Sequence, residues 1–359
     1  MTPWRPEQIW IAPGEEDTPI ARRVRAALPD VPCVTAEVGE SAAADRFAAG
    51  KRRLVLQRHR GSWLQHCPAG TAGLVCCNYL VVNFASNCPY DCSYCFLQEY
   101  IANNPAIKAF TNIDDGLAEI ATVLRAHPQR DFRIGTGELA DSLALDPITG
   151  LTSDLVPFFA AHRNVTLELK TKSDCIDNLL RLDPQDRVVV SWSVNAPTIC
   201  SNDEAGTASL SERIAAARRV QAAGYRVGFH FDPLIEHPGW AEGYRETVAM
   251  IAAVVDPRRI AWISLGSLRL SPGLRTAMRA RPTTTQVLGG ELVPGPDGKA
   301  RVWRGLRMQM YRTVEGYLRE AFPNVPSYLC MEPASVWQQV RGEVPSDREV
   351  AQRLVAGAL

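Results

Sequence analysis

The sequence shows no excess of charge of either sign and no long apolar run. Its 359 residues carry 39 Lys and Arg against 39 Asp and Glu, so the formal net charge is zero. This balance excludes a strongly basic nucleic-acid-binding protein, although it allows a local basic groove. No apolar run reaches membrane-spanning length, and the N-terminus MTPWRPEQIW lacks the apolar region of a secretion signal. We therefore expect a cytoplasmic protein without a membrane partner.

Cysteine, by contrast, is frequent, with 10 in the chain. At this length and without a secretion signal, these cysteines fit the reducing cytosol better than a disulfide scaffold. Three of them, Cys88, Cys92 and Cys95, directly follow the apolar run 79–85. Their C-x3-C-x2-C spacing suits three corners of a [4Fe-4S] cluster, whose fourth iron then stays open to another ligand. A zinc site or a chance grouping of cysteines is the alternative.

From residue 79 onwards, apolar β-prone segments alternate with amphipathic segments. The expected strands are Tyr79–Ala85, Asp131–Gly137, Val165–Thr171, Arg187–Asn195, Tyr225–Leu234 and Arg259–Leu268. The segments 116–126, 209–223 and 243–255 have helical periodicity, and Ser209 with Glu212 forms a candidate capping box. This alternation predicts parallel βα units, in which the reactive side chains gather where the strands end.

The chain divides into three expected regions. Residues 1–78 contain a strand–helix–strand unit that is too small to be a domain alone, residues 79–268 carry the alternating units, and residues 269–359 form an α-rich extension. The elements expected outside the alternating region are strands at 8–12, 33–38, 51–60 and 328–331 and helices at 19–28, 301–322 and 332–341. The last segment, 343–359, is either a further helix or a tail.

The segment Gly135-Thr136-Gly137-Glu138 ends the second expected strand. Glycine lets a ligand approach the backbone closely, and a carboxylate accepts hydrogen bonds from an ammonium group. The segment is therefore a candidate binding site, although turns between strands and helices often contain glycine for conformational reasons alone.

The cysteine spacing resembles that of the radical S-adenosylmethionine (SAM) superfamily, and a closer resemblance is to the spore photoproduct lyase family. That closer resemblance rests on residues 88–98 and on a second block that includes SWSVN (191–195), GT (206–207), ERIAA (212–216), GF (228–229), DP (232–233) and GW (239–240). It implies a partial (β/α)6 barrel with a [4Fe-4S] cluster and SAM as cofactors. In that family, reductive cleavage of SAM gives a 5′-deoxyadenosyl radical, which abstracts hydrogen and so starts the return of a thymine crosslink in DNA to two thymines.

The resemblance also implies roles for individual residues. Cys88, Cys92 and Cys95 match the cluster ligands, and Tyr94 matches a tyrosine that helps to pass the radical on. Among the remaining matches, Gly135, Thr136, Gly137, Glu138 and Lys172 are expected to bind SAM, together with Ser193 and with Asn195, which would share the strand face of Ser193. For Lys172 the alternative is a solvated charge at a strand end.

Two residues depart from the family's pattern. The lyases carry a cysteine after the second strand that returns a hydrogen atom to the repaired thymine, and Glu138 occupies that position here. A carboxyl O–H bond is too strong to serve as this donor. Phe96 replaces a second tyrosine of the cluster segment. Cys175 is our first candidate for a substitute donor, with a half-buried structural thiol as its alternative, and the other candidates are Cys67, Cys76, Cys77 and Cys200.

Two further groups of polar residues remain open. His230, Asp232, Glu236 and His237 follow the fifth expected strand, and we interpret them as the lining of a substrate cavity rather than as metal ligands. The arginines at 269, 275, 279 and 281 form either a phosphate-binding strip or a solvated helix face. Cys67, Cys76 and Cys77 are interpreted as structural thiols, with a second metal or redox site as the alternative.

Three functions are compatible with these features. Repair of a thymine photoproduct predicts salt-sensitive binding of duplex DNA. A radical reaction on a small molecule or a peptide is favoured by Glu138, Phe96 and the zero net charge. A non-catalytic iron–sulfur protein is the third, but it has no use for a SAM site. An electron donor such as flavodoxin or ferredoxin is an expected partner of either enzyme.

Overall fold

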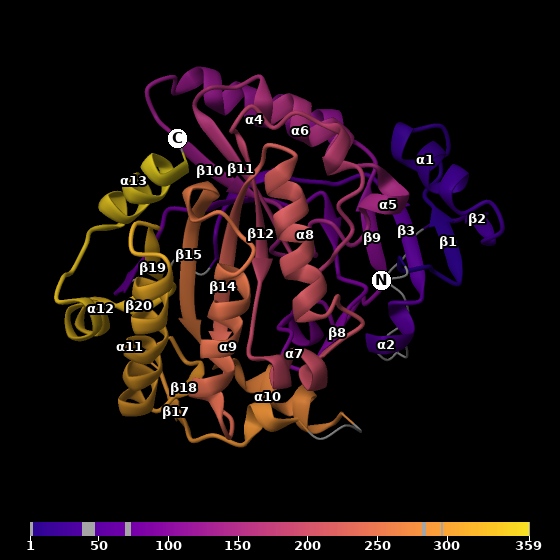
Figure 1. Ribbon diagram of the computed structural model, residues 1–359. Coiled ribbons are helices and arrows are strands. Elements are labelled where there is room, and N and C mark those ends of the chain that lie inside the picture. The colour runs from indigo at the N-terminus through magenta and orange to yellow at the C-terminus, as the bar shows by residue number, and fades with distance from the viewer. Residues whose placement is uncertain (1–2, 38–46, 69–72, 282–284, 296, 359) are drawn as a thin grey trace.

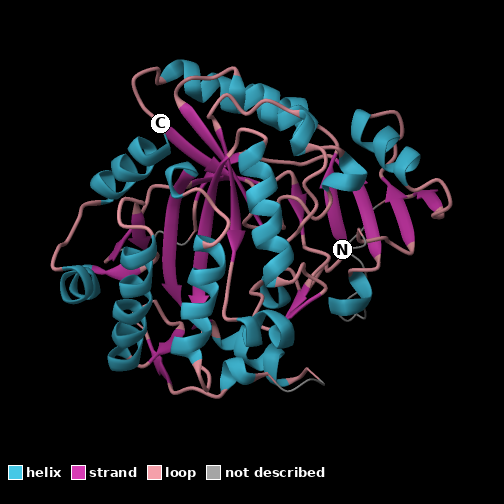
Figure 2. Ribbon diagram, viewed as in Figure 1, coloured by secondary structure: helices cyan, strands magenta, loops and turns pink. Residues whose placement is uncertain are grey.

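An eight-stranded sheet forms the centre of the structure (Figures 1 and 2). The computed structural model describes residues 3–37, 47–68, 73–281, 285–295 and 297–358. The sheet consists of parallel neighbours, except that its edge strand β4 runs antiparallel to β6. In spatial order the strands are β19 (Ser327–Leu329), β15 (Ile260–Ser267), β14 (Arg226–Leu234), β12 (Val188–Ser193), β11 (Val165–Thr171), β10 (Phe132–Gly135), β6 (Leu80–Val82) and β4 (Leu64–His66).

The sheet confirms the predicted partial barrel of parallel βα units. The expected strands are consecutive neighbours in it, and β11 has the predicted bounds. The run 79–85 is the exception, because the chain leaves this sheet after Val82 and residues Ala85–Ser86 form β7 in another sheet. An apolar run does not reveal such a crossing, since both sheets bury its side chains. The short strand expected at 328–331 is β19, which extends the parallel order beyond β15.

Helices cover one face of the eight-stranded sheet, as Figure 1 shows. The helix α6 (Thr152–Ala160) contacts β11 and β12, and α8 (Leu210–Ala222) contacts β12 and β14. The helix α9 (Trp240–Ala252) packs between α8 and α11 (Arg304–Ala321). Among the residues that the structure describes, no helix combines the length and the apolar character needed to cross a membrane.

The other helical segments are short or lie at the margins of this layer. They are α1 (Pro19–Ala27), α2 (Phe47–Gly50), α3 (Leu97–Tyr100), α4 (Ile113–Ala126), α5 (Asp146–Thr149), α7 (Pro197–Asp203), α10 (Pro272–Arg279), α12 (Ala334–Arg341), α13 (Asp347–Ala358), η1 (Leu179–Arg181), η2 (Pro257–Arg259) and η3 (Gln286–Leu288). The open alternative for 343–359 thus resolves in favour of a helix, α13.

A second, five-stranded sheet contains the N-terminal segment. Its order is β2 (Cys33–Thr35), β1 (Gln8–Ile11), β3 (Arg53–Gln57), β9 (Ile107–Phe110) and β7 (Ala85–Ser86). The parallel pair β1 and β2, joined by α1, confirms the expected strand–helix–strand unit; residue 38, at the end of its expected second strand, lies outside the described residues. Because β7 and β9 flank the cysteine segment, that segment leaves this sheet and returns to it.

Three small ladders attach the remaining strands. The ladder of β8 (Asp91–Cys92) with β13 (Glu204–Ala205) and that of β5 (Leu74–Val75) with β20 (Glu332–Pro333) are antiparallel. In the third, β18 (Ala300–Val302) pairs with β16 (Arg269–Leu270) and β17 (Leu292–Pro294). This pairing corrects the helix expected at 301–322, which begins at Arg304 because the residues before it belong to β18.

The predicted capping box begins α8. The hydroxyl of Ser209 accepts a hydrogen bond from the Glu212 amide at 3.3 Å, and the Glu212 carboxylate accepts one from the Ser209 amide at 2.7 Å. The helix ends before Gly224, whose φ of +92° suits glycine. The cap fixes the first turn of α8 and with it the buried side chain of Arg213, which enters the site described below.

Substituting Ser209→Ala removes the acceptor for the Glu212 amide and should lower the free energy of unfolding by about 1 kcal/mol. Urea unfolding followed by circular dichroism measures this change. Ser209→Asp keeps an acceptor at the same position and should stay close to the wild type. Equal stability of Ser209→Ala and the wild type would contradict the capping assignment.

Candidate active site

The face of the eight-stranded sheet that the helices leave free is polar. In β11, Leu167 and Leu169 are fully buried on the helix side, and Glu168 and Lys170 alternate with them on the other side. Parallel strands covered on both faces usually read as continuous apolar runs, so this alternation indicates a face with a chemical role. We call it the concave face; its polar residues are Arg133, Glu168, Lys170, Ser191, Ser193, His230, Asp232, Ser264 and Tyr328.

Glu168 is the centre of a buried network on the concave face. Its Oε1 accepts hydrogen bonds from Ser191 Oγ at 2.7 Å and Trp262 Nε1 at 2.8 Å, and it lies 2.7 Å from His230 Nε2. Burial opposes ionisation of this carboxyl, but His230 and Arg133 hold its pKa below the usual range. Burial lowers the pKa of His230. The network therefore holds an ionised carboxylate inside the curve of the sheet, with the Arg133 guanidinium 3.9 Å away as its counter-charge.

Arg133 shows how strongly the sheet curls. Its Nη2 donates to Tyr328 Oη at 3.2 Å and to Cys77 Sγ at 3.4 Å. Its guanidinium also lies 4.6 Å from the ring centre of Tyr79 and 4.9 Å from that of Trp262. Arg133 belongs to β10 and Tyr328 to β19, which are far apart in the strand order. Their contact therefore closes the sheet into a partial barrel across the concave face.

The cysteine segment, residues 88–95, lies where the strands of the barrel end, and we call it the cluster loop. Its strand β8 pairs with β13, which places Cys92 opposite Glu204. Ser93 Oγ donates to Asp203 Oδ1 at 2.6 Å. Asp203 ends α7 and Glu204 directly follows it, so both partners lie beyond the carboxyl end of β12. The loop thus covers the end of the barrel where chemistry is expected.

The thiols of the cluster loop form one group. Cys92 is buried, Cys88 and Cys95 pack against it together with Tyr90 and Ala144, and all are free of disulfides. Burial raises the pKa of Cys92 to about 12, against the opposing effect of Lys172. A thiolate at this position therefore needs a cation, as the irons of a cluster would provide.

The alternative of a zinc site gains no support from the structure. Within the described residues, no group of three or more His, Cys, Asp or Glu side chains is arranged to hold a metal ion. In a [4Fe-4S] cluster, by contrast, each thiolate binds a different iron, so the sulfurs need not converge on one point. The donor set of three neighbouring free thiols fits that group.

Glu204 holds the cluster loop to the barrel. Tyr94 donates its hydroxyl hydrogen to Glu204, and Arg213 Nη2 lies 2.6 Å from Glu204 Oε2. Arg213, which is fully buried, also donates to the Ser193 carbonyl at 3.0 Å. Burial opposes ionisation of Glu204, but Lys172 and Arg213 lower its pKa, so it carries the charge that both cations need.

Sequence reasoning did not identify the Glu204–Arg213 pair as part of the site. One signal was available, because Arg213 lies on the apolar face of α8 beside Leu210 and Ile214. A charged residue at such a position needs a buried partner. Nothing in the sequence identified Glu204 as that partner.

Asp91 anchors the other side of the cluster loop. Its carboxylate lies 2.6 Å from Arg281 Nη2 and 3.6 Å from Lys51 Nζ. Arg281 also donates to Gln98 Oε1 at 2.9 Å. Arg269 instead pairs with Asp232 on the concave face at 2.9 Å. The four arginines considered as one phosphate-binding strip therefore do not form one, because two of them are committed to separate carboxylates.

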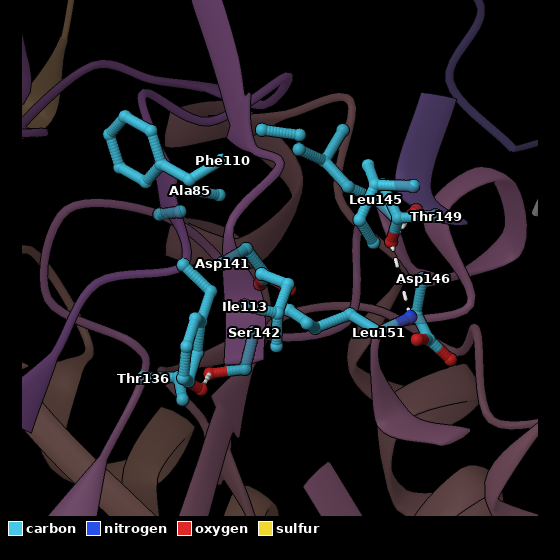
Figure 3. A pocket seen from close by; sticks show the side chains of 14 residues that line it. Ala85, Phe110, Ile113, Thr136, Asp141, Ser142, Leu145, Asp146, Thr149 and Leu151 are labelled. Carbon is cyan, nitrogen blue, oxygen red and sulfur yellow. Dashed lines mark hydrogen bonds between the residues drawn. The ribbon is translucent and has the colours of Figure 1, made fainter. Parts of the chain in front are cut away.

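The glycines after β10 serve side-chain packing. A Cβ on Gly135 would overlap the Tyr79 hydroxyl, and one on Gly137 would lie 2.8 Å from Lys170 Cβ. Thr136 faces away from the concave face and donates to Ser142 Oγ at 2.8 Å (Figure 3). Thr136 lines a largely apolar cavity of about 20 Å³, which has room for about one water molecule. Figure 3 shows the side chains around this cavity. The Thr136 side chain is thus directed away from the polar face.

Glu138 lies half-buried after Gly137. Burial raises the pKa of its carboxyl to about 7, and Lys170 opposes the rise. Its charge therefore changes near neutral pH. Lys170, which sequence reasoning passed over in favour of Lys172, belongs to this end of the concave face.

Asp141 is a further residue that sequence reasoning missed. Its Oδ2 accepts from the Lys172 amide at 2.6 Å, and its Oδ1 accepts from Thr171 Oγ1 at 2.7 Å. It also accepts from the amides of Leu143 and Ala144. These bonds fix the segment after β10 against the end of β11 and so position Glu138 relative to Lys172.

The remaining expected SAM-binding residues take different positions. Lys172 Nζ lies 3.9 Å from Glu204 Oε1 and 5.6 Å from the ring centre of Tyr94, so it lies close to the cluster loop. Ser193 is buried at the end of β12 on the concave face. Asn195 is buried too, but its side chain donates to the Pro233 carbonyl and accepts from the Tyr244 hydroxyl. The contacts of Asn195 do not support the expectation that it faces a ligand beside Ser193.

Cys175 and Phe96 lie away from the concave face. Cys175 lines a separate polar cavity of about 270 Å³ together with Asp174, Asn178 and Arg219. Phe96 is 44% exposed and packs beside the exposed Tyr100, outside the cluster loop. The His230 group is likewise no metal set among the described residues, because His230 is paired with Glu168 and Asp232 with Arg269.

Comparison with known proteins gives a consistent result. A family model described as spore photoproduct lyase matches residues 73–266. The spore photoproduct lyase of Geobacillus sp. (strain Y412MC61) is 29% identical over 49% of this chain and 51% of its own length. That of Bacillus subtilis (strain 168) is 26% identical over 68% of this chain and 73% of its own length. The chain thus spans about half the length of the Geobacillus lyase.

Solved structures share the fold. A spore photoproduct lyase with bound AdoMet and dinucleoside spore photoproduct superposes with a TM-score of 0.78 at 22% identity, covering 92% of this chain and 100% of that one. A spore photoproduct lyase complexed with dinucleoside spore photoproduct gives a TM-score of 0.79 at 22% identity, covering 91% of this chain and 100% of that one. Because the family model covers more than half of the sequence, this chain belongs to the spore photoproduct lyase family.

Proposed function

We propose that this chain is a radical SAM lyase that repairs a thymine photoproduct in DNA. The observation that carries the proposal is the group of free thiols over the carboxyl end of a polar sheet face. Family membership supports the reaction, since structures of spore photoproduct lyases contain AdoMet and the dinucleoside photoproduct. A [4Fe-4S] cluster bound by Cys88, Cys92 and Cys95 would supply the electron that cleaves SAM to a 5′-deoxyadenosyl radical.

Glu138 and Lys172 are assigned to SAM. They follow the neighbouring strands β10 and β11, and SAM carries an ammonium and a carboxylate that they match in charge. Burial opposes the charge of Lys172, but Glu204 raises its pKa, so the ammonium persists. The backbone at Gly135, Thr136, Gly137 and Ser193 borders the same end, and Asn195 follows Ser193 two residues later with its side chain bonded to Pro233 and Tyr244.

The concave face is assigned to the lesion. Its buried donors and acceptors can bind the edge of a pyrimidine that has left the duplex, and base extrusion is cheapest at a damaged site. Within the cluster loop, Tyr94 lies next to Lys172, whose Nζ is 5.6 Å from the centre of the tyrosine ring. The proposal includes a cytoplasmic location, which 10 cysteines without a disulfide among them suit, and a flavodoxin or ferredoxin as electron donor.

A radical reaction on a small molecule or a peptide is the second candidate. It is favoured by Glu138, which stands where the lyases carry their hydrogen donor, and by Phe96, whose ring lies at the surface. The two candidates share the cluster loop and the SAM contacts, so they differ in substrate alone.

The proposed function predicts 5′-deoxyadenosine from SAM and dithionite in anaerobically reconstituted protein. Irradiated duplex DNA should increase its yield and be converted to DNA with two restored thymines, and added salt should weaken the binding of DNA. Chromatography of both products measures the outcome. Turnover that ignores irradiated DNA would leave the second candidate, and an intact cluster without any 5′-deoxyadenosine would refute both.

Removal of one cluster ligand, in Cys92→Ala, should abolish stable cluster binding, because three thiolates are the protein's whole contribution to it. Iron and sulfide content and the visible absorbance after reconstitution measure this loss. Cys33→Ala, which removes an exposed thiol of the N-terminal sheet, is the matched control. A full cluster in Cys92→Ala would contradict the assignment.

The pKa of about 7 at Glu138 predicts a pH-dependent affinity for SAM. Below this pH the carboxyl is neutral and loses its attraction for the SAM ammonium; above it the carboxylate is ionised. Binding should therefore tighten by up to about tenfold between pH 6 and pH 8. In Glu138→Gln this dependence should disappear. Isothermal titration of cluster-loaded protein measures both, and an unchanged pH profile in the variant would exclude the role.

A further inference from the structure

The hydrogen atom that completes the repair needs a donor, and the family's position for it holds Glu138. A carboxyl O–H bond is stronger than the C–H bond to be formed, whereas a thiol S–H bond is weaker. The inference below rests on the proposed function and names the thiol that supplies this atom. It follows from the way in which the barrel is closed.

The antiparallel ladder of β5 and β20 closes the open side of the barrel, and we call it the seam. Its register pairs Val75 with Glu332 and Leu74 with Pro333. Cys77 lies two residues beyond Val75, and Cys330 lies two residues before Glu332, across a turn at Met331 whose φ is +56°. The sequence does not suggest this relation, because the two cysteines are remote from one another along the chain.

Cys330 lies on the concave face. It follows β19, and its amide donates to the Leu265 carbonyl at 2.7 Å, which continues the ladder with β15. Two residues earlier, Tyr328 contacts Arg133 across the concave face, so Cys330 shares that orientation. Arg269 donates to the Cys330 carbonyl at 3.1 Å and to Asp232 at 2.9 Å. The thiol thus stands at the carboxyl end of a barrel strand, among the polar residues of the mouth.

The two thiols of the seam differ in their protonation. Burial and the nearby Asp232 raise the pKa of Cys330 well above its usual range, so it keeps its S–H hydrogen. The contact with Cys76, together with Arg133, lowers the pKa of Cys77, so Cys77 ionises more readily than Cys330. An ionised thiol has no S–H hydrogen to give. Of the pair, Cys330 is the one equipped to donate a hydrogen atom.

Arg133 provides an independent sign of a ligand beside these thiols. Its side chain is 6% exposed, and its Nε lies 3.9 Å from Glu168 Oε2, an ion pair beyond hydrogen-bond distance. Neither Nε nor Nη1 has a hydrogen-bond partner among the described residues. Buried donors without a partner are costly, and a ligand with acceptor oxygens would satisfy them. The carbonyl groups of a pyrimidine are such acceptors. Since Arg133 contacts both Tyr328 and Cys77, a base bound to it would lie next to the seam.

The other candidate thiols have no comparable position. Cys175 lines the separate cavity between α5 and α8, and Cys200 points at the Asn195 carbonyl. Cys33 is exposed in the N-terminal sheet, and Cys67 follows the edge strand β4. Cys76 lies before Cys77 in the chain, and its thiol is hydrogen-bonded to that of Cys77.

We propose that Cys330 is the hydrogen-atom donor of this enzyme. The S–H bond of Cys330 breaks homolytically, and its hydrogen forms the missing C–H bond of the repaired thymine radical. The Cys330 thiyl radical that remains takes one electron from the low-potential carrier that also reduces the enzyme, and one proton from water. The thiol is thereby restored, and SAM is consumed once per repair.

Turnover in deuterium oxide tests this assignment, because thiol hydrogens exchange with solvent. The cluster-loaded protein receives SAM, dithionite and duplex DNA containing the photoproduct. Wild-type protein should place one solvent deuterium in the repaired thymine. Cys330→Ala and Cys330→Ser should still form 5′-deoxyadenosine but lose repaired thymine by at least about tenfold. Mass spectrometry of both products gives the ratio of thymine to 5′-deoxyadenosine.

Two variants complete the test. Cys33→Ala controls for the loss of a thiol as such, and Cys77→Ser should keep the deuterium transfer. Unchanged thymine yield and deuterium content in Cys330→Ala would overturn the assignment of Cys330 but not the proposed function. The same conclusion would follow if Cys77→Ser lost the deuterium transfer and Cys330→Ala kept it. Absence of 5′-deoxyadenosine from the wild type would instead refute the proposed function, and this inference with it.

Discussion

The buried carboxylate of Glu204 is the contact on which the site depends. It joins the cluster loop, through Tyr94 and the β8–β13 ladder, to Arg213 in the helix layer and to Lys172 at the end of β11. A buried ion pair contributes little net stability, but loss of one partner leaves an uncompensated charge and costs roughly 3–5 kcal/mol. The contacts of Glu204 therefore serve chiefly to position the cluster loop rather than to stabilise the fold. It fixes the thiols relative to the residues proposed to bind SAM.

The cluster loop is held from two sides, and this follows from its place between two sheets. Its ends continue into β7 and β9 of the N-terminal sheet, whereas its middle is bonded to elements of the barrel. Asp91, with Arg281 and Lys51, adds a third attachment. Sites on rigid supports keep their geometry better than sites on free loops. The N-terminal sheet thus serves as a mount for the loop rather than as a separate unit.

The sequence predicted those features that depend on local pattern. The barrel strands, the capping box at Ser209 and the grouping of Cys88, Cys92 and Cys95 are all readable from periodicity and spacing. Contacts between distant residues were not readable. Three examples are the ion pair of Glu204 with Arg213, the hydrogen bonds that Asp141 accepts and the hydrogen bond from Asn195 to Pro233. All three depend on which strands become neighbours. The crossing after Val82 was hidden for the same reason, since either sheet accepts an apolar segment.

The seam joins a strand from the early part of the chain, β5, to one from its late part, β20. A ribosome delivers the N-terminal part of a chain first, and domains begin to fold as they emerge. The cluster loop and β6 to β15 therefore leave the ribosome before β19 and β20 do. A chain that stops before Ser327 lacks both the strand that pairs with β15 and the strand that pairs with β5, so the concave face depends on the last part of the chain to be made.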